Sequence, residues 1–154
     1  MQDIDLMIAG KKALLMDKQN THLDDPAIAI DKSNILAIGR KDELFQKYHA
    51  RKLIDASNSL IMPGFINCHT HAAMTCFRGI ADDLALMDWL NNYIFPAEAR
   101  NVNKNLAYWG TMLACAEMIK SGTTTFKDMY IFEDETASAA KEAGMRCLVG
   151  EVLF

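Results

Sequence analysis

The chain has 154 residues, of which 51% are hydrophobic, and this is enough to bury the core of one ordinary domain. A formal net charge of −4, without blocks of like charge, argues against nucleic acid or an anionic membrane as a partner. The first residues lack a basic segment, and no apolar run approaches the roughly 18 residues of a membrane span, so we expect a cytoplasmic protein.

The first 59 residues have the pattern of a small β-rich module. Apolar runs bounded by turn residues predict strands at 4–8, 13–16, 27–30, 35–38 and 53–55. Residues 42–48 fit one or two helical turns.

From Leu60 onward, strands and helices alternate. Apolar runs predict strands at 60–67, 123–126 and 145–150. Helices are predicted from a cap at Asp82 or Asp83 to Phe95, where Pro96 would end the helix, from a cap at Asn103 to Gly122, and over 133–143. The middle helix is expected to bury residues 106, 109, 110, 113 and 116, with 118 or 119. This order predicts a parallel sheet with crossover helices, and a barrel and an open doubly wound sheet both fit it.

The chain ends on Glu151-Val152-Leu153-Phe154, an apolar strand end without a polar tail. Three parallel strands alone leave sheet edges and apolar faces uncovered. We therefore expect a truncated chain, and the alternative is a small natural protein that oligomerises to cover those surfaces.

His69 and His71 carry the clearest chemical signal. Their i, i+2 spacing puts both imidazoles on one face of a strand, at the C-terminal end where (β/α) barrels hold their active sites. Two neutral imidazoles are good ligands for zinc or another first-row divalent metal. An isolated H-x-H pair fits two surface histidines equally well. Asp128 and Glu151 follow the next two strands at the same end, where they either line a pocket or are solvated.

The residues that precede His69 and His71 form a longer motif with them. Ile61-Met62-Pro63-Gly64-Phe65-Ile66-Asn67-Cys68-His69-Thr70-His71 resembles the first barrel strand of the amidohydrolase superfamily, in which a P-G-[FL]-[IV]-[ND]-x-H-x-H run supplies two metal ligands. The resemblance implies an α/β fold: residues 1–59 form the N-terminal half of a small β-sandwich domain, and residues 60–154 form three strands and two helices of a metal-dependent (β/α)8 barrel. It also implies one divalent metal, zinc or iron, bound by His69 and His71. The remaining ligands and a proton-shuttling glutamate belong to later strands.

Four further segments, 75–79, 82–84, 88–90 and 95–98, resemble the branch with methylthioadenosine and S-adenosylhomocysteine deaminases and triazine chlorohydrolases. This resemblance implies that Glu98 binds ribose hydroxyls, for which a carboxylate is a good acceptor. The alternative is a solvent-exposed pair with Arg100. Trp89 either lines the pocket or packs in the core. Gly150 stands where nucleoside-processing members carry an arginine, so no substrate contact is transferred to that position.

The resemblance implies a hydrolytic deaminase that cleaves a carbon–nitrogen bond, not a peptide bond, of a small aromatic amine such as S-adenosylhomocysteine or methylthioadenosine. A homo-oligomer is consistent with the family. A chlorohydrolase or a cyclic-amide hydrolase of the same superfamily is the nearest alternative, and a non-catalytic binding module is the alternative from another class. With two metal ligands present, we expect the 154-residue chain alone to bind zinc weakly and to be inactive.

Overall fold

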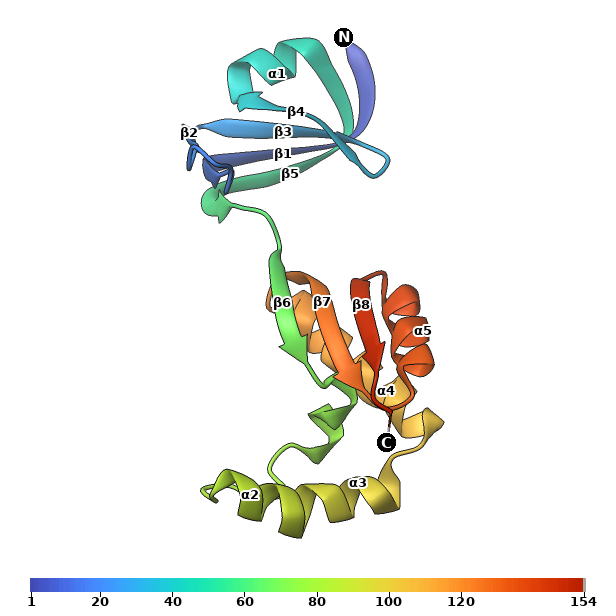
Figure 1. The fold of residues 1–154 in the computed structure, drawn as a ribbon. Helices are drawn as coiled ribbons and strands as arrows, with labels where there is room; N and C mark the ends of the chain where they lie inside the picture. The colour runs from blue at the N-terminus through green and yellow to red at the C-terminus, as the bar shows by residue number, and fades with distance from the viewer. Residues whose placement is uncertain (154) are drawn as a thin grey trace. The chain divides into compact units, whose positions relative to one another are not determined.

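The computed structural model describes residues 1–153, and the chain divides between Pro63 and Gly64 into two compact units of a mixed α/β protein (Figure 1). This division lies a few residues beyond the predicted boundary at residue 59 because the last strand of the first unit continues to Ile61. Within residues 1–153, no helix is long and apolar enough to cross a membrane.

The first unit is a five-stranded sheet with one short helix against it (Figure 1). Its elements are β1 (Gln2–Leu14), β2 (His22–Asp24), β3 (Pro26–Asp31), β4 (Asn34–Arg40), α1 (Lys41–Lys47) and β5 (Tyr48–Ile61). The strands run in the order β2-β1-β3-β4, with β5 parallel to β1. Ile4, Met7, Ala27, Ala29 and Leu44 form the buried core between the sheet and α1.

The two strands predicted at 4–8 and 13–16 are one continuous strand, β1, so the prediction of a break between them was wrong. The pairing of β1 with β5 shifts register between Gly10 and Lys12 and then continues to Ala13. Gly10 serves close packing here, because an added Cβ would lie 2.5 Å from the Ile61 side chain. Leu60 and Ile61 therefore belong to the first unit and not to the histidine-bearing strand.

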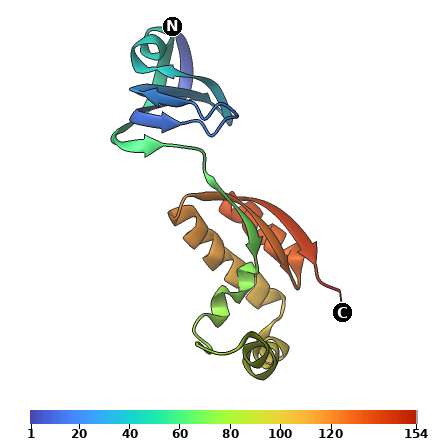
Figure 2. The same ribbon diagram turned by 60° about the vertical axis from the view of Figure 1, so that its left-hand side comes forward.

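The second unit is a three-stranded parallel sheet in the order β6-β7-β8, formed by β6 (Phe65–Thr70), β7 (Thr123–Tyr130) and β8 (Arg146–Glu151). Helices α4 (Lys104–Lys120) and α5 (Glu133–Ala143) pack against each other and against the sheet (Figures 1 and 2). Cys115, Met118, Phe126, Ala140 and Met145 belong to the core between them. Because the strands are parallel, their C-terminal ends meet at one edge.

The connection from β6 to α4 is longer and more irregular than the single predicted helix. It contains a 3-10 helix η1 (Ala72–Phe77), α2 (Leu86–Trp89), a π-helical turn η2 (Leu90–Ile94) and α3 (Phe95–Asn101). Neither Asp82 nor Asp83 caps a helix, since α2 begins after Ala85 without a side-chain cap. Pro96 does not end a helix but lies in the first turn of α3, where its missing N–H needs no partner.

Helix α4 begins and ends as predicted, but its buried residues agree with the predicted ones only at Gly110 and Met118. The Asn103 side chain accepts a hydrogen bond from Leu106 N at 3.0 Å, and Gly122 adopts φ +85° beyond the C-terminus. The helix buries mainly small residues (Ala107, Gly110, Thr111, Ala114, Cys115 and Met118). The predicted Trp109 and Leu113 remain 60% and 46% exposed. Helix α4 has apolar residues on all sides, and the side with small residues permits the closest approach to the neighbouring elements.

Gly110 is the point of closest approach, and we expect Gly110→Ala to destabilise the second unit. An added Cβ would lie 2.7 Å from the Ala73 carbonyl oxygen, so overpacking costs about 1–3 kcal/mol. At an exposed helix position, a glycine-to-alanine change stabilises the protein by about 1 kcal/mol. The sign of the change in unfolding free energy therefore shows whether Gly110 is closely packed. Denaturant unfolding followed by tryptophan fluorescence measures it, because both tryptophans lie in this unit. Asn105→Ala, at an exposed position of α4, is the control, and equal or higher stability of Gly110→Ala would contradict this packing.

Candidate metal and nucleoside site

The predicted histidine pair lies at the C-terminal edge of the parallel sheet. His69 is in β6, and His71 follows the last residue of that strand and caps η1. Their ring centroids are 5.1 Å apart, with the ring planes at 80°. The rings line a small cleft together with Cys68, Lys127 and Asp128. The two imidazoles are therefore close enough to share one metal ion, as their spacing predicts.

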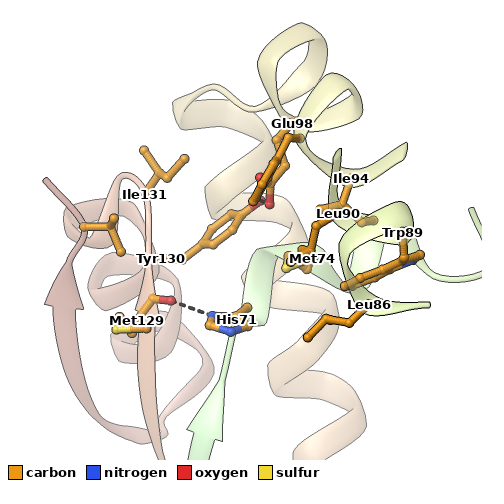
Figure 3. A pocket seen from close by; sticks show the side chains of 12 residues that line it. His71, Met74, Leu86, Trp89, Leu90, Ile94, Glu98, Met129, Tyr130 and Ile131 are labelled. Carbon is orange, nitrogen blue, oxygen red and sulfur yellow. Dashed lines mark hydrogen bonds between the residues drawn. The ribbon is translucent and has the colours of Figure 1, made fainter. Parts of the chain in front are cut away.

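A main-chain contact orients His71. Its Nδ1 lies 2.6 Å from the carbonyl oxygen of Met129 in β7 (Figure 3). A carbonyl oxygen only accepts hydrogen bonds, so Nδ1 must carry the proton and donate. The lone pair of the neutral ring is then on Nε2. A metal-binding histidine is held by the same kind of contact, in which one ring nitrogen donates to the protein and the other binds the ion.

Asp128 fixes the turn on both sides of His71. Its carboxylate is 1% exposed, and Oδ1 accepts hydrogen bonds from the Ala72 amide at 2.9 Å and from the Thr70 hydroxyl. The parallel register pairs Thr70 with Asp128 directly. Asp128 is therefore not a solvated loop residue: it lines the small cleft from a buried position, and its carboxylate binds the two residues adjacent to His71 in the chain.

A second pair of carboxylates lies beside Asp128, where β8 and α5 meet. Glu151 accepts hydrogen bonds from the amides of Phe132 and Glu133 at 3.0 and 2.7 Å. Phe132 adopts a left-handed conformation (φ 61°, ψ 49°), which is unfavourable for a bulky residue. The Glu151 contacts thus hold a strained turn in place.

Glu133 itself is 2% exposed, and its two carboxyl oxygens have no hydrogen-bond partner within residues 1–153. Burial, and secondarily the charge of Asp128, raise the pKa of Glu133 to about 8. Glu133 is therefore a buried acid that stays protonated at neutral pH.

A larger cavity of about 370 Å³ opens beside His71, between the end of β7 and the α2–α3 segment (Figure 3). Its wall is mostly apolar and includes Leu86, Trp89, Leu90 and Ile94. Glu98 also faces this cavity, and its Oε1 accepts a hydrogen bond from the Tyr130 hydroxyl at 2.6 Å. Its partner is thus Tyr130 and not Arg100. A pocket of this size with few polar groups is typical of a small-molecule site.

Three of the four residues selected from the sequence, His71, Trp89 and Glu98, line this one cavity, and His69 lies in the adjoining small cleft. Sequence reasoning missed the two contacts that orient them, the Met129 carbonyl and the Tyr130 hydroxyl. The Met129 contact leaves no sequence signal, because any residue supplies a carbonyl. Tyr130 had a weak signal, since it lies two residues beyond Asp128 and therefore on the same face of β7.

The donor set fits part of a metal site. Catalytic zinc takes about three protein ligands and keeps one position open. Within residues 1–153, no group of three or more His, Cys, Asp or Glu side chains is arranged to hold a metal ion. His69 and the oriented Nε2 of His71 are suitable for two of the ligands.

Comparison with known proteins identifies the family. Residues 60–154, more than half of the chain, match the amidohydrolase family. The chain belongs to this family, as its P-G-F-I-N-C-H-T-H run predicts.

Particular relatives narrow the comparison. The chain is similar to the 5-methylthioadenosine/S-adenosylhomocysteine deaminase 1 of Syntrophus aciditrophicus, with 63% sequence identity over all 154 residues. The match covers 35% of the length of that relative. An adenosine deaminase from Xanthomonas campestris, solved with bound zinc, matches 96% of the chain and 34% of its own length, with 34% identity and a TM-score of 0.93. Atrazine chlorohydrolase from Arthrobacter aurescens, complexed with zinc, matches 95% of the chain and 35% of its own length at 22% identity and a TM-score of 0.81, which shows a shared fold. The chain spans about a third of the length of these relatives.

The buried Glu133 predicts a pH-dependent stability. Its pKa is raised in the folded state, so folding favours the protonated form, and this contribution is lost as pH rises from about 4.5 to about 8. The loss is at most about 1.4 kcal/mol per pH unit. We expect Glu133→Gln, which stays neutral, to remove this part of the pH dependence and to raise the melting temperature relative to the parent above pH 8. Tryptophan fluorescence during thermal unfolding measures it, with Glu142→Gln, an exposed position of α5, as control. An unchanged pH dependence would contradict the buried-acid assignment.

Proposed function

We propose that this chain supplies two metal ligands and the nucleoside-binding wall of a hydrolytic deaminase that acts on an adenosine-type nucleoside such as S-adenosylhomocysteine or methylthioadenosine. The observation that carries the proposal is the single cavity that holds a potential ligand, His71, at one end and a hydrogen-bonded carboxylate, Glu98, at the other. The deaminase relatives support it. The same proposal makes the two units parts of a small β-sandwich and a (β/α)8 barrel.

In this proposal His69 and His71 hold one divalent ion, zinc or iron, with ligands outside residues 1–154. When bound, such an ion lowers the pKa of water and so supplies a nucleophile near neutral pH. The chain's own residues place the substrate: Glu98 accepts hydrogen bonds from the ribose hydroxyls, and the apolar wall around Trp89 excludes bulk water from the nucleoside. Hydrolysis replaces the ring amino group with oxygen and releases ammonia.

The pocket favours a nucleoside over the alternative substrates. A triazine or a cyclic amide has no vicinal diol, so it cannot donate hydrogen bonds from two adjacent hydroxyls to the Glu98 carboxylate, which lies in a mostly apolar cavity. A pocket built around an accepting carboxylate selects ligands that donate to it. A homo-oligomer and a cytoplasmic location stay predictions from the sequence.

A hybrid protein tests the activity directly. In it, this chain replaces the matching segment of the Syntrophus aciditrophicus relative, which is 63% identical over all 154 residues. We expect the zinc-loaded hybrid to release ammonia from methylthioadenosine. His69→Ala or His71→Ala should reduce the rate by more than the about 10–100-fold that loss of an outer-shell partner costs. His22→Ala, in the first unit, is the matched control, and a hybrid in which all three variants retain the rate would contradict the ligand assignment.

The chain alone gives the complementary prediction. Because it holds two ligands where catalytic zinc needs about three, we expect the isolated 154-residue chain to bind zinc weakly and to release no ammonia from methylthioadenosine. Ammonia release by the isolated chain is measured at a zinc concentration that saturates the hybrid. Turnover by the isolated chain that is lost on His71→Ala would show that residues 1–154 contain a complete site and would refute this division of the ligands.

A further inference from the structure

The C-terminal end of β7 contacts both ends of the proposed site through consecutive residues. Met129 accepts the His71 Nδ1 hydrogen bond through its carbonyl oxygen, and Tyr130 donates to Glu98 through its hydroxyl (Figure 3). The His71 and Tyr130 rings lie 6.1 Å apart between their centroids. The metal end and the polar end of the cavity are therefore held by one short piece of backbone.

Tyr130 is itself held firmly. The side chain is 6% exposed, and it packs in a buried cluster with Ala73 and Ala107. Its carbonyl oxygen accepts a hydrogen bond from Val152 N at 2.9 Å, which anchors the strand end to the residue after β8. The phenol hydroxyl consequently points from a fixed backbone position toward Glu98, which comes from the separate helix α3.

The hydrogen bond has one direction. Burial, and secondarily the Glu98 carboxylate, raise the pKa of Tyr130, so the hydroxyl stays protonated and donates. Glu98 accepts this bond through Oε1, and within residues 1–153 no donor reaches Oε2. One carboxylate oxygen is thus used for orientation, and the other remains available as an acceptor on a residue that lines the cavity.

We propose that Tyr130 is the positioning residue for Glu98, and that it makes the pocket selective for nucleosides with a free ribose 2′,3′-diol. This inference rests on the proposed function, because it assumes that Glu98 contacts the ribose. Without the phenol hydroxyl, the Glu98 side chain loses its fixed rotamer and must be ordered by the ligand, which weakens diol binding. In this inference, the end of β7 determines the spacing between His71, the proposed metal ligand, and Glu98, the proposed acceptor for the diol.

The chain contains a matched control for this contact. Tyr108 in α4 donates to Glu142 in α5 at 2.5 Å, so it forms the same type of pair. Glu142 is exposed, and neither residue lines the cavity. Tyr108→Phe therefore removes a tyrosine–glutamate hydrogen bond without changing the proposed site.

The experiment compares adenosine with 2′,3′-dideoxyadenosine in the zinc-loaded hybrid protein. We expect Tyr130→Phe to lower kcat/KM for adenosine by about tenfold, the effect of one hydrogen bond to a charged group, chiefly through a higher KM. The value for the dideoxy compound should change less than about twofold, because that compound has no hydroxyls for Glu98 to bind. Tyr108→Phe should change neither value.

The outcomes separate this inference from the function on which it rests. Equal losses for both nucleosides would show that Tyr130 only stabilises the fold, and no loss for either would show that Glu98 needs no orientation; both results would overturn the inference while leaving the deaminase proposal intact. If the hybrid releases no ammonia, the deaminase proposal fails. In that case, calorimetry measures the binding of adenosine and of 2′,3′-dideoxyadenosine to the metal-free hybrid. The inference about Tyr130 stands if adenosine binds and Tyr130→Phe weakens only the adenosine complex. Any other result overturns the inference.

Discussion

The hydrogen bond from His71 Nδ1 to the Met129 carbonyl oxygen is the contact on which the site depends. Because the oxygen cannot donate, the bond selects one tautomer and leaves the Nε2 lone pair free. It joins the end of β6 to the end of β7, so the parallel register of these strands determines where a ligand atom lies. The neighbouring residues of β7 extend this control, with Asp128 holding the turn around His71 and Tyr130 holding Glu98.

This arrangement depends on close backbone packing and on costly buried groups. Gly64, before β6, would place an added Cβ 2.2 Å from the Thr124 side chain, and Gly110 lets α4 approach the turn after His71. Asp128 and Glu133 are both almost fully buried, and desolvation keeps Glu133 protonated near neutral pH. Unsatisfied buried carboxyl oxygens and a left-handed Phe132 are unfavourable for stability. Such features at the edge that holds the histidines are typical of functional sites.

Much of the fold follows from local sequence signals, and the exceptions have physical causes. Asn103 and Gly122 mark helix ends through chemistry within a few residues, and the structure confirms them. The buried face of α4 was predicted correctly only at Gly110 and Met118, because large apolar residues were preferred, whereas packing selected mainly small ones. The spacing of His69 and His71 predicted their proximity. The contact between Tyr130 and Glu98 joins residues 32 positions apart, and the contact between His71 and Met129 joins residues 58 positions apart. No local pattern encodes these two pairings.

The most direct test of the site is the nitrogen NMR spectrum of the histidine rings during zinc titration of the 154-residue chain. The chain has four histidines, so His22 and His49 serve as internal controls. Before zinc is added, the His71 ring should be the tautomer with the proton on Nδ1. Zinc should shift the ring resonances of His69 and His71, with the His71 change on Nε2 and its Nδ1 still protonated. Loss of the proton from His71 Nδ1 when zinc binds, or equal shifts at all four histidines, would contradict the proposed metal site.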